Sequence, residues 1–211
     1  MSKQMTVAIA GLGSRGRDTY AKAAKIYPDK MKIVAIADID SEKVKLTAEE
    51  YDVPMSHCYE SAEDMLKEEK LADVMIIATQ DRQHVGQAIK ALKKGYHLLL
   101  EKPISPDLGE CRKISEVAKE CKREVVVCHV LRYTPIYQKV KEILDAGTIG
   151  DVISIMAIEN VGWFHQAHSF VRGNWANSDE TSPMILQKCC HDMDILIWLT
   201  GKRARYVSSY G

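Results

Sequence analysis

Three glycines, Gly11, Gly13 and Gly16, lie between a short apolar run and a segment of helical composition. In this pattern the first glycine permits a tight turn, the second lets the backbone approach a pyrophosphate, and the third lets a helix pack closely on a strand. The start of the helix supplies N–H groups and positive potential that attract phosphates. We therefore predict a dinucleotide-binding loop made by Gly11, Gly13, Ser14, Arg15 and Gly16.

Asp38 ends the second apolar run and is placed to accept hydrogen bonds from an adenosine ribose. The same carboxylate repels a 2′-phosphate, by about 4 kcal/mol for unit charges ~4 Å apart at an effective dielectric of ~20. The sequence therefore favours NAD over NADP as the cofactor. Lys43 and Arg15 are the cations that would offset part of this repulsion.

Apolar runs and helical segments alternate through the first 130 residues. Runs that are apolar on both faces and separated by helices are typical of a parallel sheet covered on each side. We therefore predict a doubly wound, Rossmann-type α/β domain over residues 1–130. Its expected strands are 6–10, 32–37, 73–78, 96–100 and 124–128, and its expected helices are 14–26, 41–51 (capped by Ser41), 61–69, 82–94 and 107–122.

The pattern changes after residue 130, and residues 131–211 are expected to form a second, partial domain. A polar and aromatic loop at 161–181 separates two of its expected helices. The expected elements are helices at 134–145 and 183–199, a strand at 151–160 and the start of another strand at 205–209.

Composition excludes several classes of function. Lys plus Arg and Asp plus Glu both number 29, so the formal net charge is zero and gives no field to attract nucleic acid or an anionic membrane. No segment approaches the ~20 apolar residues that span a bilayer. The first strand follows the N-terminus too closely for a signal peptide, and the six cysteines lack zinc-site spacing. We expect a cytoplasmic protein with reduced thiols and no metal.

Further motifs lie at the ends of the later strands and in the second domain. Taken together, they make the chain resemble the Gfo/Idh/MocA oxidoreductases, the family of glucose–fructose oxidoreductase and inositol dehydrogenase. The motifs are G-x-G-x-x-G-R at 11–17, Thr79 with His84, Glu101-Lys102-Pro103, Arg132-Tyr133, Gly-Thr-Ile-Gly at 147–150, and His191 with Asp194.

The resemblance implies a Rossmann domain followed by an α/β domain whose open, largely antiparallel sheet often mediates homo-oligomers. It also implies hydride transfer between NAD and a hydroxyl-bearing carbon of a sugar, sugar acid or cyclitol. Lys102 and His191 would lie beside the nicotinamide, where an imidazole can take the hydroxyl proton and an ammonium can stabilise the oxygen. The further cofactor contacts that it implies are Thr79, Gln80, His84, Glu101 and Lys102. The Lys102–Pro103 bond is a candidate cis peptide.

The expected helix at 183–199 carries Gln187, His191 and Asp194 on one polar face. Asp194 is placed to orient His191 or to pair with its charged form. A metal site from residues 189–192 is rejected, since consecutive helical residues diverge by ~100°.

This helix departs from the family that the chain resembles. Many members carry aspartate where this chain has Gln187, and glycine where it has Cys189. A neutral amide cannot lend charge to the histidine, so Asp194 and Lys188 are the candidates to replace it. We expect a substrate that differs from that of inositol dehydrogenase.

The loop before this helix crowds polar donors beside aromatic rings, a combination that suits hydroxyl-rich sugars. Arg172 would alternatively grip the carboxylate of a sugar acid. His165 is a candidate second acid or base. The expected substrate contacts are Arg132, Asn160, His165, Arg172, Asn174, Trp175 and Gln187.

Two other functions remain open from the sequence. One is a redox-assisted glycoside hydrolase or eliminase that reduces NAD transiently, and the other is a non-catalytic NAD(H)-binding sensor. The length of 211 residues is short for the family that the chain resembles. About 80 residues after the first domain are too few for an open sheet, so we expect a truncated second domain that is partly disordered or supported by another chain.

Overall fold

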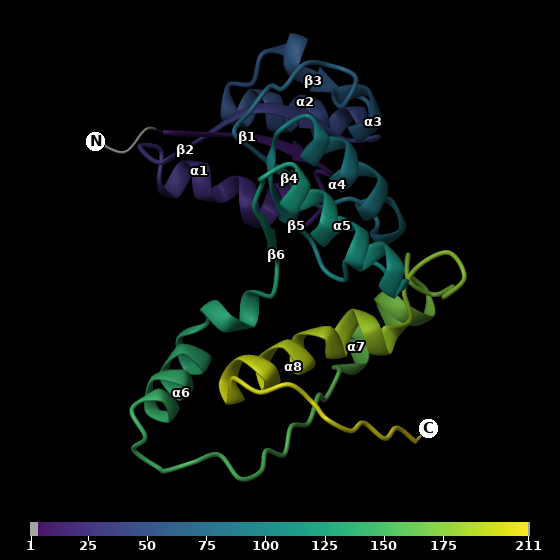
Figure 1. Cartoon of the computed structure of the whole chain (residues 1–211). Helices are drawn as coiled ribbons and strands as arrows, with labels where there is room; N and C mark the ends of the chain where they lie inside the picture. Colours follow the sequence, from purple (N-terminus) through teal and green to yellow (C-terminus); the bar gives the residue numbers. More distant parts are fainter. Residues whose placement is uncertain (1–3, 211) are drawn as a thin grey trace. The chain divides into compact units, whose positions relative to one another are not determined.

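The computed structural model describes residues 4–210 and divides the chain into two compact units, Met1–Cys128 and His129–Gly211. Figure 1 shows the helices and strands of the two units.

Unit 1 is built on a parallel sheet of six strands in the order β3-β2-β1-β4-β5-β6, which confirms the Rossmann-type fold. The chain moves outward from β1 in one direction and then returns to β4 on its other side. Ligands of such sheets bind beyond the carboxyl ends of the strands at this reversal. The strands are β1 (Met5–Ala10), β2 (Met31–Ala37), β3 (Cys58–Tyr59), β4 (Val74–Ile77), β5 (His97–Leu100) and β6 (Val125–Val127).

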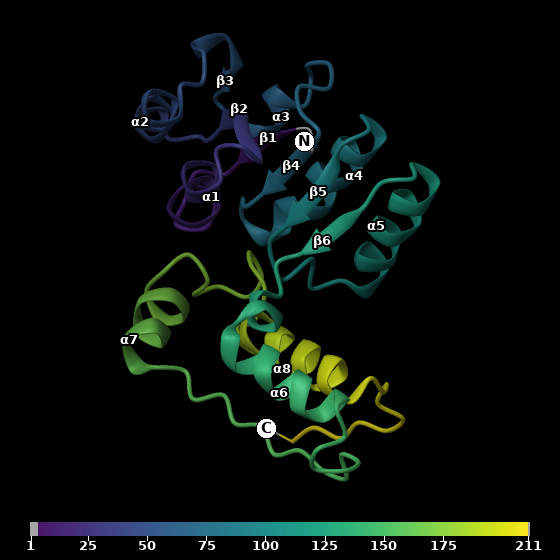
Figure 2. The same ribbon diagram turned by 90° about the vertical axis from the view of Figure 1, so that its left-hand side faces the viewer.

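Helices cover both faces of the sheet, with α1 and α2 on one side and α4 and α5 on the other (Figure 2). Side chains alternate along β1, so Val7 and Ile9 enter one core while Ala8 and Ala10 enter the other. The helices are η1 (Gly16–Ala21), α1 (Lys22–Ile26), α2 (Ser41–Tyr51), η2 (Met55–His57), α3 (Ala62–Met65), η3 (Asp81–Gln83), α4 (His84–Lys93) and α5 (Leu108–Glu120).

Three local features of unit 1 differ from the sequence expectation. The first helix begins as the π-helical turn η1 before it continues as α1. The N-cap of α2 is Asp40 and not Ser41, because the Asp40 carboxylate accepts hydrogen bonds from the N–H groups of Glu42 and Lys43. The strand β3 was not expected, since two residues are too short to give a periodic pattern.

Unit 2 is helical, and the strands expected at 151–160 and 205–209 are not formed. Among the described residues after Val127, no residue belongs to a strand, and both segments are irregular. A strand needs a hydrogen-bonding neighbour, and the two segments do not pair with each other or with another part of the unit. The elements are η4 (Val130–Tyr133), α6 (Pro135–Asp145), α7 (Trp163–His165), η5 (Gln166–Val171) and α8 (Met184–Thr200); α7 and η5 lie within the expected loop at 161–181.

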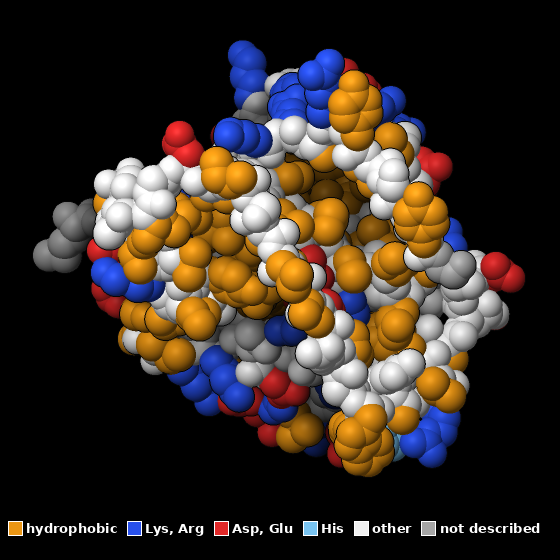
Figure 3. Space-filling model, turned by 90° about the horizontal axis from the view of Figure 1, so that it is seen from below, with side chains coloured by type: hydrophobic (Ala, Val, Ile, Leu, Met, Phe, Trp, Pro, Cys, Tyr) orange, Lys and Arg blue, Asp and Glu red, His pale blue; other side chains and the backbone are white. Residues whose placement is uncertain are grey.

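Unit 2 exposes much of its apolar surface. On α8 the side that is most buried includes Gln187, whereas Ile185 is 65% exposed. The view from below in Figure 3 shows many apolar side chains on the visible face. Exposed apolar side chains of unit 2 include Ile136, Ile153, Met156, Ile158, Met193 and Ile197. On α8, Ile195 is buried together with the polar Gln187, while Ile185, Met193 and Ile197 stay exposed.

The core of unit 1 gives a stability test. Leu100 is fully buried in β5, whereas Leu46 on α2 is 47% exposed. We expect Leu100→Ala to lower the free energy of unfolding by about 2–5 kcal/mol, because it leaves a cavity beside packed side chains. The matched Leu46→Ala should change it by about 0.5 kcal/mol or less. Urea denaturation followed by circular dichroism measures both, and equal losses would contradict this assignment of the core.

Candidate functional site

The turn after β1 brings backbone unusually close to its neighbours. Gly11 has a φ of +88°, and a Cβ there would lie 2.5 Å from the carbonyl oxygen of Ala78. A Cβ on Gly16 would lie 1.8 Å from the carbonyl oxygen of Gly11, so only glycine lets the helix approach the turn. Gly13 differs, since a Cβ there would meet no atom within 4 Å. The open side of the turn at Gly13 is where a pyrophosphate would approach the backbone.

Asp38 is fixed at the carboxyl end of β2. One of its oxygens accepts a hydrogen bond from the Leu12 N–H at 2.5 Å, and the other accepts one from the Asp40 N–H at 2.9 Å. A carboxylate has about four acceptor sites, so these two bonds leave capacity for a ligand hydroxyl. Lys43, a candidate to offset the charge of Asp38, instead lies 3.2 Å from the Asp40 carboxylate.

The other predicted loop residues are open to solvent. Ser14 is exposed, and its carbonyl oxygen accepts a hydrogen bond from the Thr19 hydroxyl at 3.0 Å. The exposed Arg15 guanidinium lies 3.9 Å from a carboxylate oxygen of Glu101. Arg15 therefore bridges the edge of the sheet from the glycine turn toward the end of β5.

Glu101 is 6% exposed and is held by two donors. The Tyr20 hydroxyl donates to its Oε1, and the Lys102 N–H donates to its Oε2 at 3.0 Å. The Lys102–Pro103 peptide is cis. These contacts fix the backbone at Lys102, which is half-buried.

Tyr20 and Cys128 belong to this cluster, although sequence analysis did not select them. Burial and hydrogen bonds to Cys128 and Glu101 raise the pKa of Tyr20, and burial raises the pKa of the Cys128 thiol to about 12. Both groups are therefore protonated near neutral pH and can act as donors. No motif marks a tyrosine inside the first helix, so only the folded chain reveals its contact with the end of β5.

The residues after β4 are connected by hydrogen bonds to other elements. The Thr79 hydroxyl donates to Gln87 at 2.7 Å, and Gln87 donates to Glu63 at 3.0 Å. Gln80 is exposed and His84 is 1% exposed. The ring nitrogens of His84 lie 2.9 Å from the carbonyl oxygen of Pro103 and 3.1 Å from that of Thr79.

His84, a predicted cofactor contact, is buried between two turns of the backbone. Both ring nitrogens face backbone carbonyls, and burial lowers the pKa of the imidazole. The side chain links the turn after β4 to the turn that follows Lys102. His84 thus connects these two turns, and its contact with the cofactor stays a prediction.

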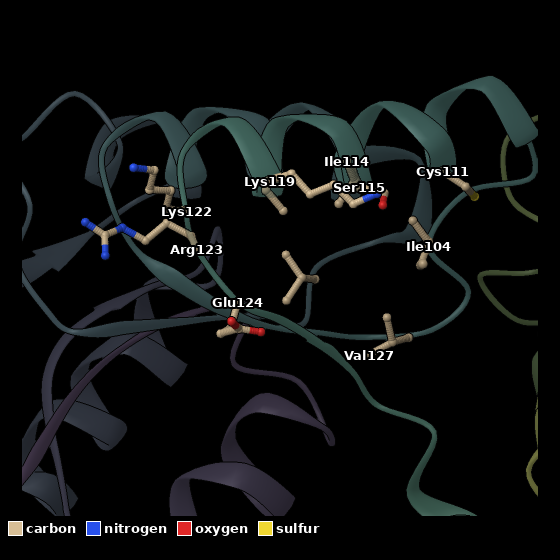
Figure 4. A pocket seen from close by; sticks show the side chains of 11 residues that line it. Ile104, Cys111, Ile114, Ser115, Lys119, Lys122, Arg123, Glu124 and Val127 are labelled. Carbon is tan, nitrogen blue, oxygen red and sulfur yellow. The ribbon is translucent and has the colours of Figure 1, made fainter.

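A cavity of about 390 Å³ lies elsewhere in unit 1, between α5 and β6 (Figure 4). Its lining includes Ile104, Ile114 and Val127 together with the charged side chains of Lys122 and Arg123. None of the predicted cofactor residues lines this cavity. The candidate cofactor site is therefore the edge formed by the ends of β1, β2, β4 and β5.

In unit 2, Arg132 and Asp194 bind each other. The Nε and Nη2 atoms of Arg132 each donate to a different oxygen of Asp194, both at 2.6 Å. The hydrogen bond to Asp194 raises the pKa of Arg132, whose guanidinium also lies 5.9 Å from the centre of the Trp198 ring. The Asp194 side chain is 12% exposed. With both oxygens bonded to Arg132, Asp194 anchors α8 to η4, and its action on His191 stays a prediction.

His191 instead contacts His129 through an edge-to-face ring pair, with the centroids 5.7 Å apart. Gln187, one turn earlier on α8, is 5% exposed, so it does not line an open surface as the sequence suggested. A buried amide makes contacts within the unit more readily than with a substrate.

The remaining predicted substrate residues lie in the segment before α8. Asn160, Arg172 and Asn174 are exposed, and Trp175 is half-buried. The structure brings His165 to Lys188, whose ammonium contacts the imidazole Nε2. No cluster of His, Cys, Asp or Glu suited to a metal occurs among residues 4–210, and no described helix is long and apolar enough to cross a membrane.

Comparison with known protein families identifies the family to which a chain with this site geometry belongs. The profile for the oxidoreductase family with an NAD-binding Rossmann fold matches residues 5–129, and the profile for the GFO/IDH/MocA C-terminal domain matches residues 137–211. The chain belongs to the GFO/IDH/MocA oxidoreductase family. Its first unit is an NAD-binding Rossmann domain, as the glycine turn and Asp38 predicted.

Individual relatives of this family member are distant in sequence. It is 25% identical over 210 residues to the putative oxidoreductase YteT of Bacillus subtilis, covering 97% of this chain and 48% of that protein. It is 25% identical over 204 residues to an inositol 2-dehydrogenase of Corynebacterium glutamicum, covering 96% and 56%. The chain thus spans about half the length of the curated relatives that it matches.

A solved structure supports the same fold. The scyllo-inositol dehydrogenase from Lactobacillus casei, with bound NAD(H) and scyllo-inositol, superposes with a TM-score of 0.79 at 25% identity. The match covers 94% of this chain and 57% of that one.

The glycine turn supplies a binding test that separates ligand approach from folding. We expect Gly13→Ala to weaken NADH binding at least about tenfold while leaving the unfolding midpoint unchanged, because the new methyl group enters open space on the ligand side. Gly16→Ala should instead lower the unfolding midpoint, since its methyl group meets the Gly11 carbonyl. Calorimetric titration and thermal melts measure the two effects. Unaltered NADH binding by Gly13→Ala would contradict the assignment.

Proposed function

We propose that the protein is an NAD-dependent oxidoreductase that transfers hydride between the nicotinamide and a hydroxyl-bearing carbon of a cyclitol, sugar or sugar acid. The observation that carries this proposal is the shared sheet edge of unit 1. There the open backbone at Gly13, the anchored carboxylate of Asp38 and the fixed backbone of Lys102 follow the carboxyl ends of β1, β2 and β5 in one parallel sheet.

The residues of this edge fit NAD. The turn at Gly13 would hold the pyrophosphate, and Asp38 would accept hydrogen bonds from the adenosine ribose. NAD, when bound, supplies the site that accepts or returns the hydride. Asp40 engages Lys43, so that lysine is not free to neutralise Asp38 for a 2′-phosphate. This supports NAD as the cofactor in preference to NADP.

Lys102 and His191 are the proposed catalytic residues. The Lys102 ammonium would hydrogen-bond the reacting oxygen and stabilise the negative charge that develops there. The imidazole of His191 would take the hydroxyl proton during oxidation and return it during reduction. Asp194 is omitted from this set because Arg132 holds both of its carboxylate oxygens.

The substrate class is supported by the names of the relatives, which include inositol 2-dehydrogenases and a scyllo-inositol dehydrogenase. Exposed amides at Asn160 and Asn174 and the guanidinium of Arg172 suit hydroxyl or carboxylate groups. Gln187 provides no negative charge near His191, which supports a substrate or proton route different from that of the inositol enzymes.

The surroundings of the protein are also proposed. Six free cysteines support a reducing, cytoplasmic location. The exposed apolar side chains of α6, α8 and residues 153–158 support homo-oligomer formation.

Catalysis is tested by removing the two proposed groups. We expect Lys102→Met and His191→Ala each to lower kcat by about 10²- to 10⁴-fold in a dehydrogenase screen of cyclitols, sugars and sugar acids with NAD. Lys93→Met, which changes an exposed lysine of α4, is the matched control and should retain activity. NADH titration shows whether each variant still binds the cofactor. Full activity of both variants would refute the assignment.

Cofactor choice is tested at Asp38. We expect Asp38→Asn to keep the shape and the acceptor for the Leu12 N–H but to lose the charge that repels a 2′-phosphate. The ratio of the NADPH to the NADH dissociation constant should fall at least about tenfold. Asp52→Asn, at the far end of α2, is the control and should leave this ratio unchanged. A ratio that is the same in both variants would show that Asp38 does not select the cofactor.

A further inference from the structure

Unit 2 holds a lysine–histidine pair that sequence spacing does not reveal. Lys188 lies on α8 and His165 ends α7, 23 positions earlier in the chain. The Lys188 Nζ contacts the imidazole Nε2, and the Nδ1 atom on the other side of the ring lies 3.2 Å from the Ser169 hydroxyl. The His165 ring is exposed, so this pair is accessible to a small molecule.

The contact fixes which group carries the charge. A lysine–histidine hydrogen bond needs one donor and one acceptor, and two positive charges at this separation repel each other. Lysine binds its proton far more tightly than histidine, so Lys188 is the cation and His165 is neutral. Phe170 supports this assignment, because Lys188 Nζ lies 5.7 Å from the centre of its ring, within the range of a cation–π interaction.

The same contact selects the tautomer of His165. Nε2 accepts from Lys188, so the single ring proton lies on Nδ1 and is donated to the Ser169 hydroxyl. The Phe170 ring meets the imidazole edge to face, with the centroids 5.7 Å apart, and limits its rotation. Ser169 and Phe170 from η5 and Lys188 from α8 each face the imidazole.

We propose that Lys188 is a positioning residue that holds His165 neutral with its proton on Nδ1, so that the pair forms a subsite for a substrate hydroxyl. A hydroxyl that enters between the two side chains would donate its proton to the lone pair of Nε2 and accept a hydrogen bond from the Lys188 ammonium. The hydroxyl-binding part rests on the proposed function. The Lys188–His165 pair offers a cation and an acceptor side by side, the combination that a polyol hydroxyl needs to donate and accept at once.

The experiment is nitrogen-15 NMR of the histidine rings in the full chain, which needs no substrate. The chain has seven histidines, and His165→Gln assigns the signal of interest. We expect the parent to show the proton of His165 on Nδ1. In Lys188→Met the pH midpoint of the His165 titration should rise by about half a pH unit or more, because the neighbouring cation no longer opposes the imidazolium.

Two control variants accompany this measurement. Lys188→Arg keeps a cation and N–H donors, so the midpoint of His165 should stay near that of the parent. Lys139→Met removes an exposed lysine of α6 that pairs with Glu142, and it should have no effect on His165. An unchanged midpoint in Lys188→Met, or a parent ring with its proton on Nε2, overturns the proposal.

A kinetic readout tests the hydroxyl subsite separately. For a polyol that the chain oxidises, the acid limb of the kcat/KM profile should move to higher pH in Lys188→Met, and Lys188→Arg should restore it. An unmoved acid limb with the expected NMR shift overturns the subsite alone. If no polyol is oxidised, the proposed function fails, while the NMR result still decides the role of Lys188.

Discussion

The candidate cofactor site depends on the close approach of two backbone segments at Gly11 and Gly16. A single methyl group on Gly16 would occupy the position of the Gly11 carbonyl, so the start of the first helix can meet the turn only without a side chain. The same approach brings Leu12 within reach of Asp38, because the N–H of Leu12 then points at the end of β2. The carboxylate is consequently aimed by backbone geometry, and it does not rely on a flexible neighbouring side chain.

Unit 1 was predictable from the sequence because each of its local signals agrees with the global arrangement. Apolar runs such as Val74–Ile77 are buried on both faces, and a run of that kind is typical of a central parallel strand. The features that escaped prediction depend on contacts between distant residues. Tyr20 meets Glu101 across 81 positions of the chain, and no local spacing encodes such a contact.

Unit 2 was less predictable from the sequence. Its apolar segments have the composition of buried strands, but in the described chain they have no strand beside them. The apolar residues at 153–158 alternate only partly and find no neighbouring strand, so they remain irregular. On α8 the polar positions were assigned to a cleft, yet Asp194 is held by Arg132 and Gln187 is buried. Sequence periodicity identifies the polar and apolar faces of a helix. It does not predict which face packs against a neighbouring element when an ion pair such as Arg132–Asp194 holds the polar face.

The contact between Tyr20 and Glu101 has a consequence for how the two ends of the site respond to each other. Tyr20 lies in the helix that starts at the glycine turn, and Glu101 immediately precedes Lys102. The Tyr20 hydroxyl therefore connects the end of the site where we propose that the pyrophosphate binds to the end that carries the proposed catalytic lysine. A displacement of the first helix changes the hydrogen bonding of Glu101 and, through the N–H of Lys102, the backbone from which that lysine extends. If Lys102 acts as proposed, cofactor binding and lysine placement form one linked equilibrium rather than two independent ones.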